Sequence, residues 1–479
     1  MQILTLSQLS GADSRSLFAF FISEDKLQAC KDLCQKQLGE KLELDAIKAG
    51  TSRLEVLGGR IALFVGISNE ADTEALRQAA HAVYEVAEQF QFSQLVLAPM
   101  DNRLHISEAI SEALVLSSYQ FSTYKKEPFP RMVKQAYILA ESELAASAIE
   151  HGQKIASATC IARDLVNEPV ITLTAPEFGN RIERLGEQYG FETEVWNKDK
   201  IESMKMGGIL AVNAGSEIPP TFSILSHKLE NPVNDQPIIL VGKGVVFDTG
   251  GLSLKPTTRS MDFMKSDMAG AAAVVGAICG LAMLNSRYHV IGLIPATDNR
   301  PGKNAVVPGD VIRMHDGTSV EVMNTDAEGR LILADALAFA KKYNPEVVID
   351  LATLTGAAVT AVGSQGIAMM GTADEKKKKA LKLAGDTVYE RLVEFPLWEE
   401  YGDLLKSEIA DMKNLGGREA GAITAGKFLA HFTDYPWMHL DIAGPSFLFA
   451  KSSYRGKQAT GVGVRLLINF ISNYEQEQK

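Results

Sequence analysis

Features typical of membrane, secreted and redox proteins are scarce in this sequence of 479 residues. The chain has only 4 cysteines, and its closest pair has the spacing C-x3-C, which is typical of neither a zinc site nor a redox motif. It has no run of about 18 uninterrupted apolar residues, so we expect no membrane span. The first residues, MQILTLSQLS, lack the basic and apolar regions of a secretion signal. These absences favour a cytoplasmic protein.

Several motifs that define large enzyme classes are also missing. The chain has neither the G-x-x-x-x-G-K-[ST] pattern nor a G-x-G-x-x-G turn between strand and helix, which argues against nucleotide binding. It lacks an H-E-x-x-H helix and a serine nucleophile elbow, which disfavours a zinc protease with one metal ion and a serine hydrolase. The net charge of -11 argues against a broad nucleic-acid surface.

What the sequence does contain is an alternation of strand and helix patterns along most of its length, which predicts an α/β fold. We expect two domains, each a sheet flanked by helices: an N-terminal α/β domain at 1–160, with a linker helix at about 142–166, and a C-terminal domain at 167–479. The expected strands are 17–22, 60–67, 94–99, 237–242, 288–294 and 346–352. The expected helices are 73–90, 142–166, 268–284 and 331–343, and a hairpin is expected at 311–324.

Charged residues gather just after the expected strands and before the apolar helices of the second domain. In an open α/β sheet, ligands bind beyond the carboxyl ends of the strands. Carboxylate oxygens favour divalent cations, and a pair of metal ions could share bridging carboxylates. The residues at these positions are Lys243, Asp248, Lys255, Asp267, Asp326, Glu328 and Arg330.

Two interpretations of this pattern remain open from the residues alone. Asp326 and Glu328 could simply cap the helix that follows them, because acidic residues suit the first turn of a helix. Taken together, the charged residues instead indicate a metal-dependent hydrolase with carboxylate ligands and an unknown substrate.

Three segments in this order resemble motifs of the leucyl (cytosol) aminopeptidases: VGKGVVFDTGGLSLKP (241–256), MKSDMAGAAAV (264–274) and NTDAEGRL (324–331). The last of these is the signature of that family. The resemblance covers roughly residues 160–470, including HLDIAG (439–444), whereas the first domain is matched only by position and general α/β character. The C-terminal domain would then be the catalytic metallopeptidase domain.

The resemblance implies a site for two metal ions, Zn²⁺ and/or Mn²⁺. It assigns Lys243 and Asp267 to one metal and Asp326 to the other, with Asp248 and Glu328 reaching both. In the family, a water activated by the two metals attacks the first peptide bond. Lys255 would stabilise the developing oxyanion, and Arg330 would hold a bicarbonate that acts as general base.

The resemblance also suggests the substrate contacts and the assembly. The residues expected around the first side chain and backbone of the peptide are Met264, Asn324, Thr353, Leu354 and Gly356. We expect a preference for Leu or Met at the peptide N-terminus, and a homohexamer made of two trimers. Two alternatives from other classes are a DNA-binding regulator with secondary peptidase activity and a metallohydrolase of another bond, such as a phosphoester.

Overall fold

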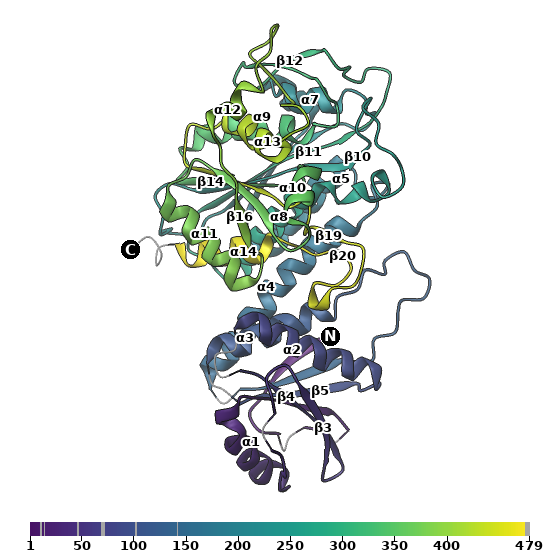
Figure 1. Ribbon diagram of the computed structural model, residues 1–479, viewed down its shortest axis with the longest axis vertical. Coiled ribbons are helices and arrows are strands. Elements are labelled where there is room, and N and C mark those ends of the chain that lie inside the picture. Colours follow the sequence, from purple (N-terminus) through teal and green to yellow (C-terminus); the bar gives the residue numbers. More distant parts are fainter. Residues whose placement is uncertain are drawn as a thin grey trace. The chain divides into compact units, whose positions relative to one another are not determined.

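The computed structural model describes residues 1–9, 12–13, 15–45, 47–68, 72–100, 103–140 and 142–474. The chain forms two compact units, one of Met1–Ser157 with Ala450–Gly456 and the other of Ala158–Phe449 with Lys457–Lys479. Helix α4 (Glu143–Asn167) contributes residues to both. Each unit is an α/β structure (Figure 1), which confirms the predicted fold class.

The N-terminal unit is built on a sheet with the strand order β1-β6-β5-β2-β4-β3 among its described residues. Neighbouring strands are parallel except β3, which is antiparallel to β4. Every residue of β2 is buried, as expected for a central strand of a mostly parallel sheet. The strands are β1 (Gln2–Leu6), β2 (Leu17–Ile22), β3 (Ser52–Leu57), β4 (Arg60–Gly66), β5 (Gln94–Pro99) and β6 (Gln135–Leu139). The helical segments are η2 (Glu24–Lys26), α1 (Leu27–Leu33), η3 (Cys34–Leu38), α2 (Thr73–Gln89) and α3 (Leu104–Ser117).

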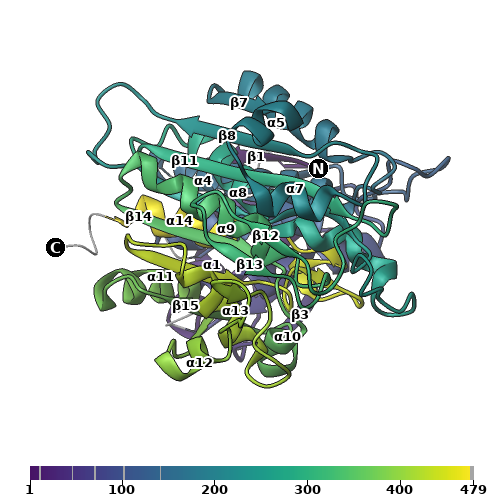
Figure 2. The same cartoon turned by 90° about the horizontal axis from the view of Figure 1, so that it is seen from above.

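The C-terminal unit is built on a larger sheet with the order β16-β15-β18-β14-β9-β11-β8-β7, and β10 pairs with β11 beside this path. The central strands β18, β14, β9 and β11 are parallel, and so is β10, whereas β8 and β15 are antiparallel to their inner neighbours. In Figure 2, the labelled strands β7, β8, β11, β14 and β15 follow one another in this order from the top of the view downward. The strands are β7 (Glu192–Trp196), β8 (Thr221–His227), β9 (Ile238–Gly242), β10 (Gly244–Asp248), β11 (Val290–Asn299), β14 (Val347–Ala352), β15 (Ile367–Gly371), β16 (Leu392–Glu394) and β18 (Trp437–Asp441).

Helices α8 (Ala269–Met283) and α9 (Gly329–Ala340) pack on opposite faces of this sheet. Successive residues of a strand point to opposite faces. On β11, Gly292 faces α8 so closely that an added Cβ would lie 2.6 Å from Ile278 Cδ1. Its neighbours Ile291 and Leu293 belong to the buried cluster that contains the apolar residues of α9. Both helices are apolar because each covers a buried sheet face.

One described helical stretch, Met261–Met283, is long and apolar enough to cross a membrane by length and composition. It consists of the 3₁₀ helix η4 (Met261–Met268) followed by α8. Of its most apolar window, 89% is buried inside the unit. Packing against the sheet therefore accounts for its composition.

The remaining elements surround the sheet or form small sheets of their own. The predicted hairpin is confirmed, since β12 (Val311–Arg313) pairs antiparallel with β13 (Ser319–Glu321), and β17 (Met412–Lys413) adds to β13 in parallel. Strand β19 (Phe447–Leu448) pairs with β20 (Gln458–Ala459). The other helices are α5 (Ala175–Tyr189), α6 (Lys198–Ser203), α7 (Gly207–Asn213), η5 (Lys341–Tyr343), α10 (Gly356–Val362), α11 (Glu375–Val388), α12 (Glu399–Asp403), α13 (Gly421–Ala430), η6 (Ser453–Arg455) and α14 (Val464–Ser472).

One strand is longer than the sequence predicts, and the difference matters for the site. The expected strand at 288–294 continues in the structure to Asn299, because β8 pairs with it as far as Ala296 and β10 pairs with it from there to its end. This extension brings Asn299 to the carboxyl edge of the sheet.

Candidate active site

The predicted metal ligands meet at the carboxyl edge of the parallel strands in the C-terminal unit. Lys243 follows β9 directly, and Asp248 is the last residue of β10. Asp267 lies near the end of η4, just before α8, and Glu328 directly precedes α9. Because parallel strands end at the same edge, residues far apart in the sequence come together here.

Lys243 lies at the centre of one half of the site. Its Nζ is 2.9 Å from Asp267 Oδ2 and 2.9 Å from Glu328 Oε1. The same Nζ donates a hydrogen bond to the main-chain oxygen of Thr353 at 2.8 Å. Only 3% of the Lys243 side chain is exposed. Its contacts with two carboxylates place this lysine where a metal ligand is expected.

Lys255 lies in the other half. Its Nζ is 2.9 Å from Asp248 Oδ2 and 2.5 Å from Asp326 Oδ1. The Lys255 side chain is 14% exposed and that of Asp326 is 33% exposed, so this half is the more open to solvent. A lysine that is reachable from solvent and held between two carboxylates can contact a bound substrate.

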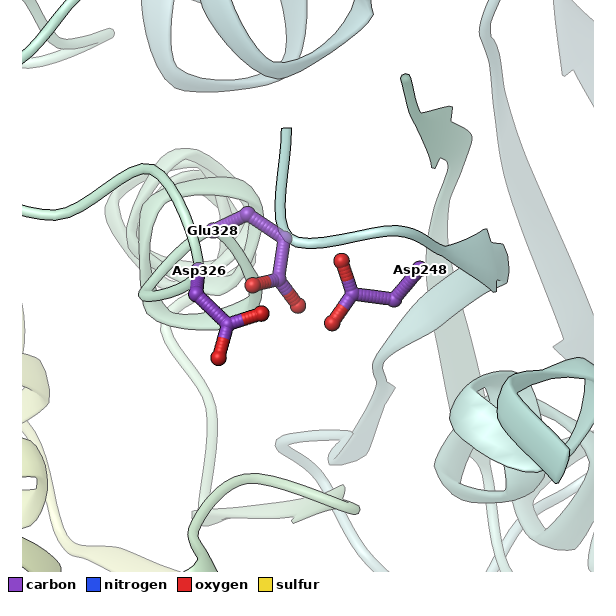
Figure 3. Close-up of side chains that lie close together, drawn as sticks. All are labelled: Asp248, Asp326 and Glu328. Carbon is purple, nitrogen blue, oxygen red and sulfur yellow. The ribbon is translucent and has the colours of Figure 1, made fainter. Parts of the chain in front are cut away.

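Three of the carboxylates point toward one another (Figure 3). One oxygen from each of Asp248, Asp326 and Glu328 lies within 4.8 Å of the others, which suits a shared metal ion. Asp267 Oδ2 and Asp326 Oδ1 are buried and accept no hydrogen bond from any described residue, although each lies beside a lysine ammonium. Buried polar atoms in proteins are normally hydrogen-bonded, so these oxygens are available as ligands. The donor set therefore fits divalent cations.

Helix capping does not account for this arrangement. Glu328 occupies the N-cap position of α9, yet its side chain accepts no capping hydrogen bond from the described backbone. It lies instead beside Lys243. The Glu328 carboxylate therefore does not cap the helix, although its position in the sequence would allow it to.

Burial and charge shift the pKa values of these groups. Burial raises the pKa of Asp267 well above its ordinary value, and burial together with the charge of Glu328 raises that of Asp248 to about 7. Burial opposes the ionised forms of Lys243 and Glu328 as well, but the charge of Asp267 raises the pKa of Lys243, and the charge of Lys243 lowers that of Glu328. A divalent cation would favour the ionised aspartates and the neutral lysine.

Arg330 lies on the first turn of α9 and is buried. Its Nη1 donates to the main-chain oxygen of Asn414 at 2.7 Å, whereas its Nε finds no acceptor in the described part of the chain. Burial lowers the pKa of Arg330 to about 10, although the negative charges of Glu328 and Asp441 partly oppose this shift. The guanidinium therefore stays charged near neutral pH and retains a donor for an anion.

The five predicted substrate-contact residues differ in how closely they contact the proposed metal ligands. Thr353 Oγ1 donates to Asp267 Oδ1 at 2.8 Å, and Asn324 Oδ1 accepts from the main-chain nitrogen of Asp326 at 2.8 Å. These two residues therefore support metal-ligand candidates. The other three predicted contacts lie on neighbouring segments without a described contact to the carboxylates: Met264 on η4, Leu354 after β14, and Gly356 at the start of α10.

Three polar residues that support the site were not among the predicted site residues. Asn299 Nδ2 donates to Asp248 Oδ1 at 2.8 Å, and Asp441 accepts from the main-chain nitrogen of Leu354 at 3.1 Å. Both end a strand at the carboxyl edge, so the rule that locates Asp248 could have found them. The third, Asn414, contacts the 323–330 segment, and no local pattern marks it.

Comparison with known proteins identifies the family. Residues 160–468 match the model of the cytosol aminopeptidase family, catalytic domain. This chain belongs to the cytosol aminopeptidase family. A relative named probable cytosol aminopeptidase, from Chlorobaculum tepidum, is 43% identical over 86% of this chain and 86% of its own.

Solved structures agree with this family assignment. The bottromycin maturation enzyme BotP in complex with Mn has a TM-score of 0.85 at 31% identity, covering 96% of this chain and 99% of that one. A mutant of tomato leucine aminopeptidase has a TM-score of 0.85 at 27% identity, covering 99% of this chain and 96% of that one. As a member of the cytosol aminopeptidase family, the chain is a metal-dependent aminopeptidase.

Gly329 offers a test of the lysine in this site. A Cβ at this position would lie 2.5 Å from Lys243 Cε and 2.6 Å from its Nζ. The end of a lysine side chain can move without a backbone shift, so we expect Gly329→Ala to keep the melting temperature of the wild type. Its affinity for metal ions should fall by about 10- to 100-fold, as is common when groups that orient ligands are disturbed.

Binding of Mn²⁺ measured by calorimetry checks this expectation. Gly366→Ala is the matched control, because the nearest atom to an added Cβ there is an ordinary 3.6 Å away. Equal Mn²⁺ affinity in the two variants would contradict the placement of Lys243 in the metal site.

Proposed function

We propose that this aminopeptidase holds two divalent metal ions, Zn²⁺ and/or Mn²⁺, and removes the first residue of peptides. The proposed ligands are Lys243, Asp248, Asp267, Asp326 and Glu328. The observation that carries the proposal is their convergence at one edge of the sheet. Two of the carboxylate oxygens there, Asp267 Oδ2 and Asp326 Oδ1, are buried and accept no hydrogen bond from the described residues. Manganese in the BotP complex supports Mn²⁺ as one of the metals.

Lys243 is the unusual member of this set, because a lysine must be neutral to act as a ligand. Its reference pKa is about 10.4, so releasing the proton near pH 7 costs about 4–5 kcal/mol. Burial of the side chain favours the neutral form, but the charges of Asp267 and Glu328 outweigh it and raise the pKa of Lys243. The bound cations must therefore supply this cost and offset the attraction of the two carboxylates.

We assign the catalytic groups as Lys255 and Arg330. When bound, the metal ions would acidify a water molecule and polarise the scissile carbonyl. Lys255, on the more open side of the site, would donate to the carbonyl oxygen as negative charge develops there. Arg330 would hold a bicarbonate through its guanidinium, and this anion would serve as the general base.

These proposed groups all belong to residues 167–479, which we regard as the catalytic domain. Residues 1–160 would form a separate N-terminal α/β domain, with α4 as the connection. The proposed ligands and catalytic residues come from the strand ends and helix starts of one sheet, so the chemistry needs no side chain from the N-terminal domain.

Comparing the metal content and kcat of variants separates the proposed roles. Lys255→Ala should keep both metals and lose about 10²-fold or more in kcat, the usual effect of removing one oxyanion-stabilising group. Asp326→Ala should lose metal and activity together. Arg330→Ala should keep its metals and lose less activity than Lys255→Ala, and added bicarbonate should stimulate it more than the wild type.

The assay is hydrolysis of a leucine anilide, with metal content measured on the same samples. Loss of metal in Lys255→Ala, or full activity in Arg330→Ala, would contradict the roles assigned here. A wild type that is inactive both with and without added Mn²⁺ would refute the proposed function as a whole.

The proposed substrate contacts favour an apolar first residue. Met264, Asn324, Thr353, Leu354 and Gly356 would surround the first side chain and backbone of the peptide. We expect Leu- and Met-terminal dipeptides to be turned over faster than Asp- and Lys-terminal ones. An apolar pocket would remove a charged side chain from water without supplying a partner for its charge. Comparable kcat/KM values for the four dipeptides would show that this pocket is misassigned.

We further propose that the protein acts in the cytoplasm as a homohexamer made of two trimers. The names of its relatives, cytosol aminopeptidases, support the compartment. Light scattering should give a mass of six chains of 52.0 kDa. A mass near that of one chain would contradict the hexamer.

A further inference from the structure

The segment that carries Asp326, Glu328 and Arg330 has little regular structure of its own. It leaves β13 at Glu321 and enters α9 at Gly329, with turns and irregular backbone between. A metal site needs its ligands fixed, and residues that orient ligands have large effects on metal affinity. Groups outside the segment must therefore hold its backbone.

Asn414 is one such group. It directly follows β17, which pairs with β13, and its main-chain nitrogen donates to the main-chain oxygen of Glu321 at 3.0 Å. The residue is completely buried. Its position is thus fixed by the small sheet at the base of the segment.

The side-chain amide of Asn414 is used entirely on this segment. Its Oδ1 accepts from the main-chain nitrogens of Met323 at 2.8 Å and Asn324 at 3.4 Å. Its Nδ2 donates to the main-chain oxygens of Asn324 at 2.8 Å and Ala327 at 3.4 Å. An asparagine amide offers two donors and one oxygen with two lone pairs, so this set matches its full capacity.

The main chain of Asn414 holds the far end of the same segment. Its carbonyl oxygen accepts from Arg330 Nη1 at 2.7 Å. One residue therefore contacts the backbone on both sides of Asp326 and the guanidinium that follows Glu328. No described contact joins its side chain to a carboxylate of the site.

From these contacts we infer that Asn414 is a positioning residue for the metal site, holding the 323–330 segment so that Asp326 and Glu328 face the cations. The inference rests on the proposed metal site and extends it to a residue whose side chain makes no described hydrogen bond to the side chain of a proposed ligand. A purely structural asparagine would contribute to stability without changing metal affinity.

Two substitutions remove the contacts in different ways. Asn414→Ala removes the whole amide. Asn414→Asp keeps the shape and the oxygen that accepts from Met323 and Asn324, but its second oxygen faces the carbonyls of Asn324 and Ala327 without a proton to donate. For both variants we expect the Kd for Mn²⁺ to rise by about 10- to 100-fold, with kcat for the leucine anilide lowered and KM little changed.

Asn234→Ala is the matched control within the same unit. The Asn234 amide donates to the main-chain oxygens of Gln236 at 2.8 Å and His289 at 3.0 Å and accepts from the nitrogen of His289 at 2.7 Å. It precedes β9, so it lies at the amino edge of the sheet rather than at the carboxyl edge. This variant should lose thermal stability while keeping the wild-type Kd for Mn²⁺.

Calorimetric titration of the metal-free full chain with Mn²⁺, together with thermal unfolding, decides the question. A raised Kd in both Asn414 variants, with a wild-type Kd in Asn234→Ala, supports the inference. A wild-type Kd in the Asn414 variants overturns it and leaves the metal site standing. Insolubility of both Asn414 variants beside a soluble Asn234→Ala also overturns it, because Asn414 would then be needed for folding itself. A wild type that binds no Mn²⁺ overturns the metal site and the inference together.

Discussion

Four carboxylates gather at one edge of the larger sheet, and three of them, those of Asp248, Asp267 and Glu328, are buried. This concentration of negative charge is the constraint on which the rest of the site depends. Burying a carboxylate without a partner is costly, so each must be protonated, paired with a cation or bound to a metal. Lys243 and Lys255 each lie between two of the four, which balances only part of the charge. The structure is thereby prepared for divalent cations.

The fold produces this concentration through the direction of its strands. β9 and β14 run parallel and end together, β10 continues beyond β9 along β11 to Asp248, and α8 and α9 begin where the acidic residues lie. Amides also hold this arrangement, in addition to the two lysines: Asn299 donates to Asp248, and Asn414 holds the backbone beside Asp326. Neutral groups of this kind fix geometry without adding to the charge that the cations must balance.

Much of this arrangement was accessible from the sequence, and the reason is local. Lys243 and Asp248 follow buried apolar runs, and Asp326 and Glu328 precede an apolar helix, so position in the chain places them at the sheet edge. Contacts between distant segments were not accessible. Arg330 and Asn414 are 84 residues apart in the chain, and neither segment indicates the other. The buried pair of Asp350 on β14 and His439 on β18 could not be predicted either. Their Oδ1 and Nδ1 atoms lie 2.6 Å apart, but the pattern of apolar residues within one strand does not show which residue of the next strand lies opposite.

The central claim is that one sheet edge holds two metal ions through five side chains. X-ray diffraction from crystals grown with Mn²⁺, recorded to measure anomalous scattering, tests it directly. We expect two anomalous peaks about 3.5–4 Å apart, as in other two-metal sites, one beside Lys243 and Asp267 and the other beside Asp326, with Asp248 and Glu328 between them. A single peak, or peaks that leave Lys243 outside the coordination of both, would contradict the account.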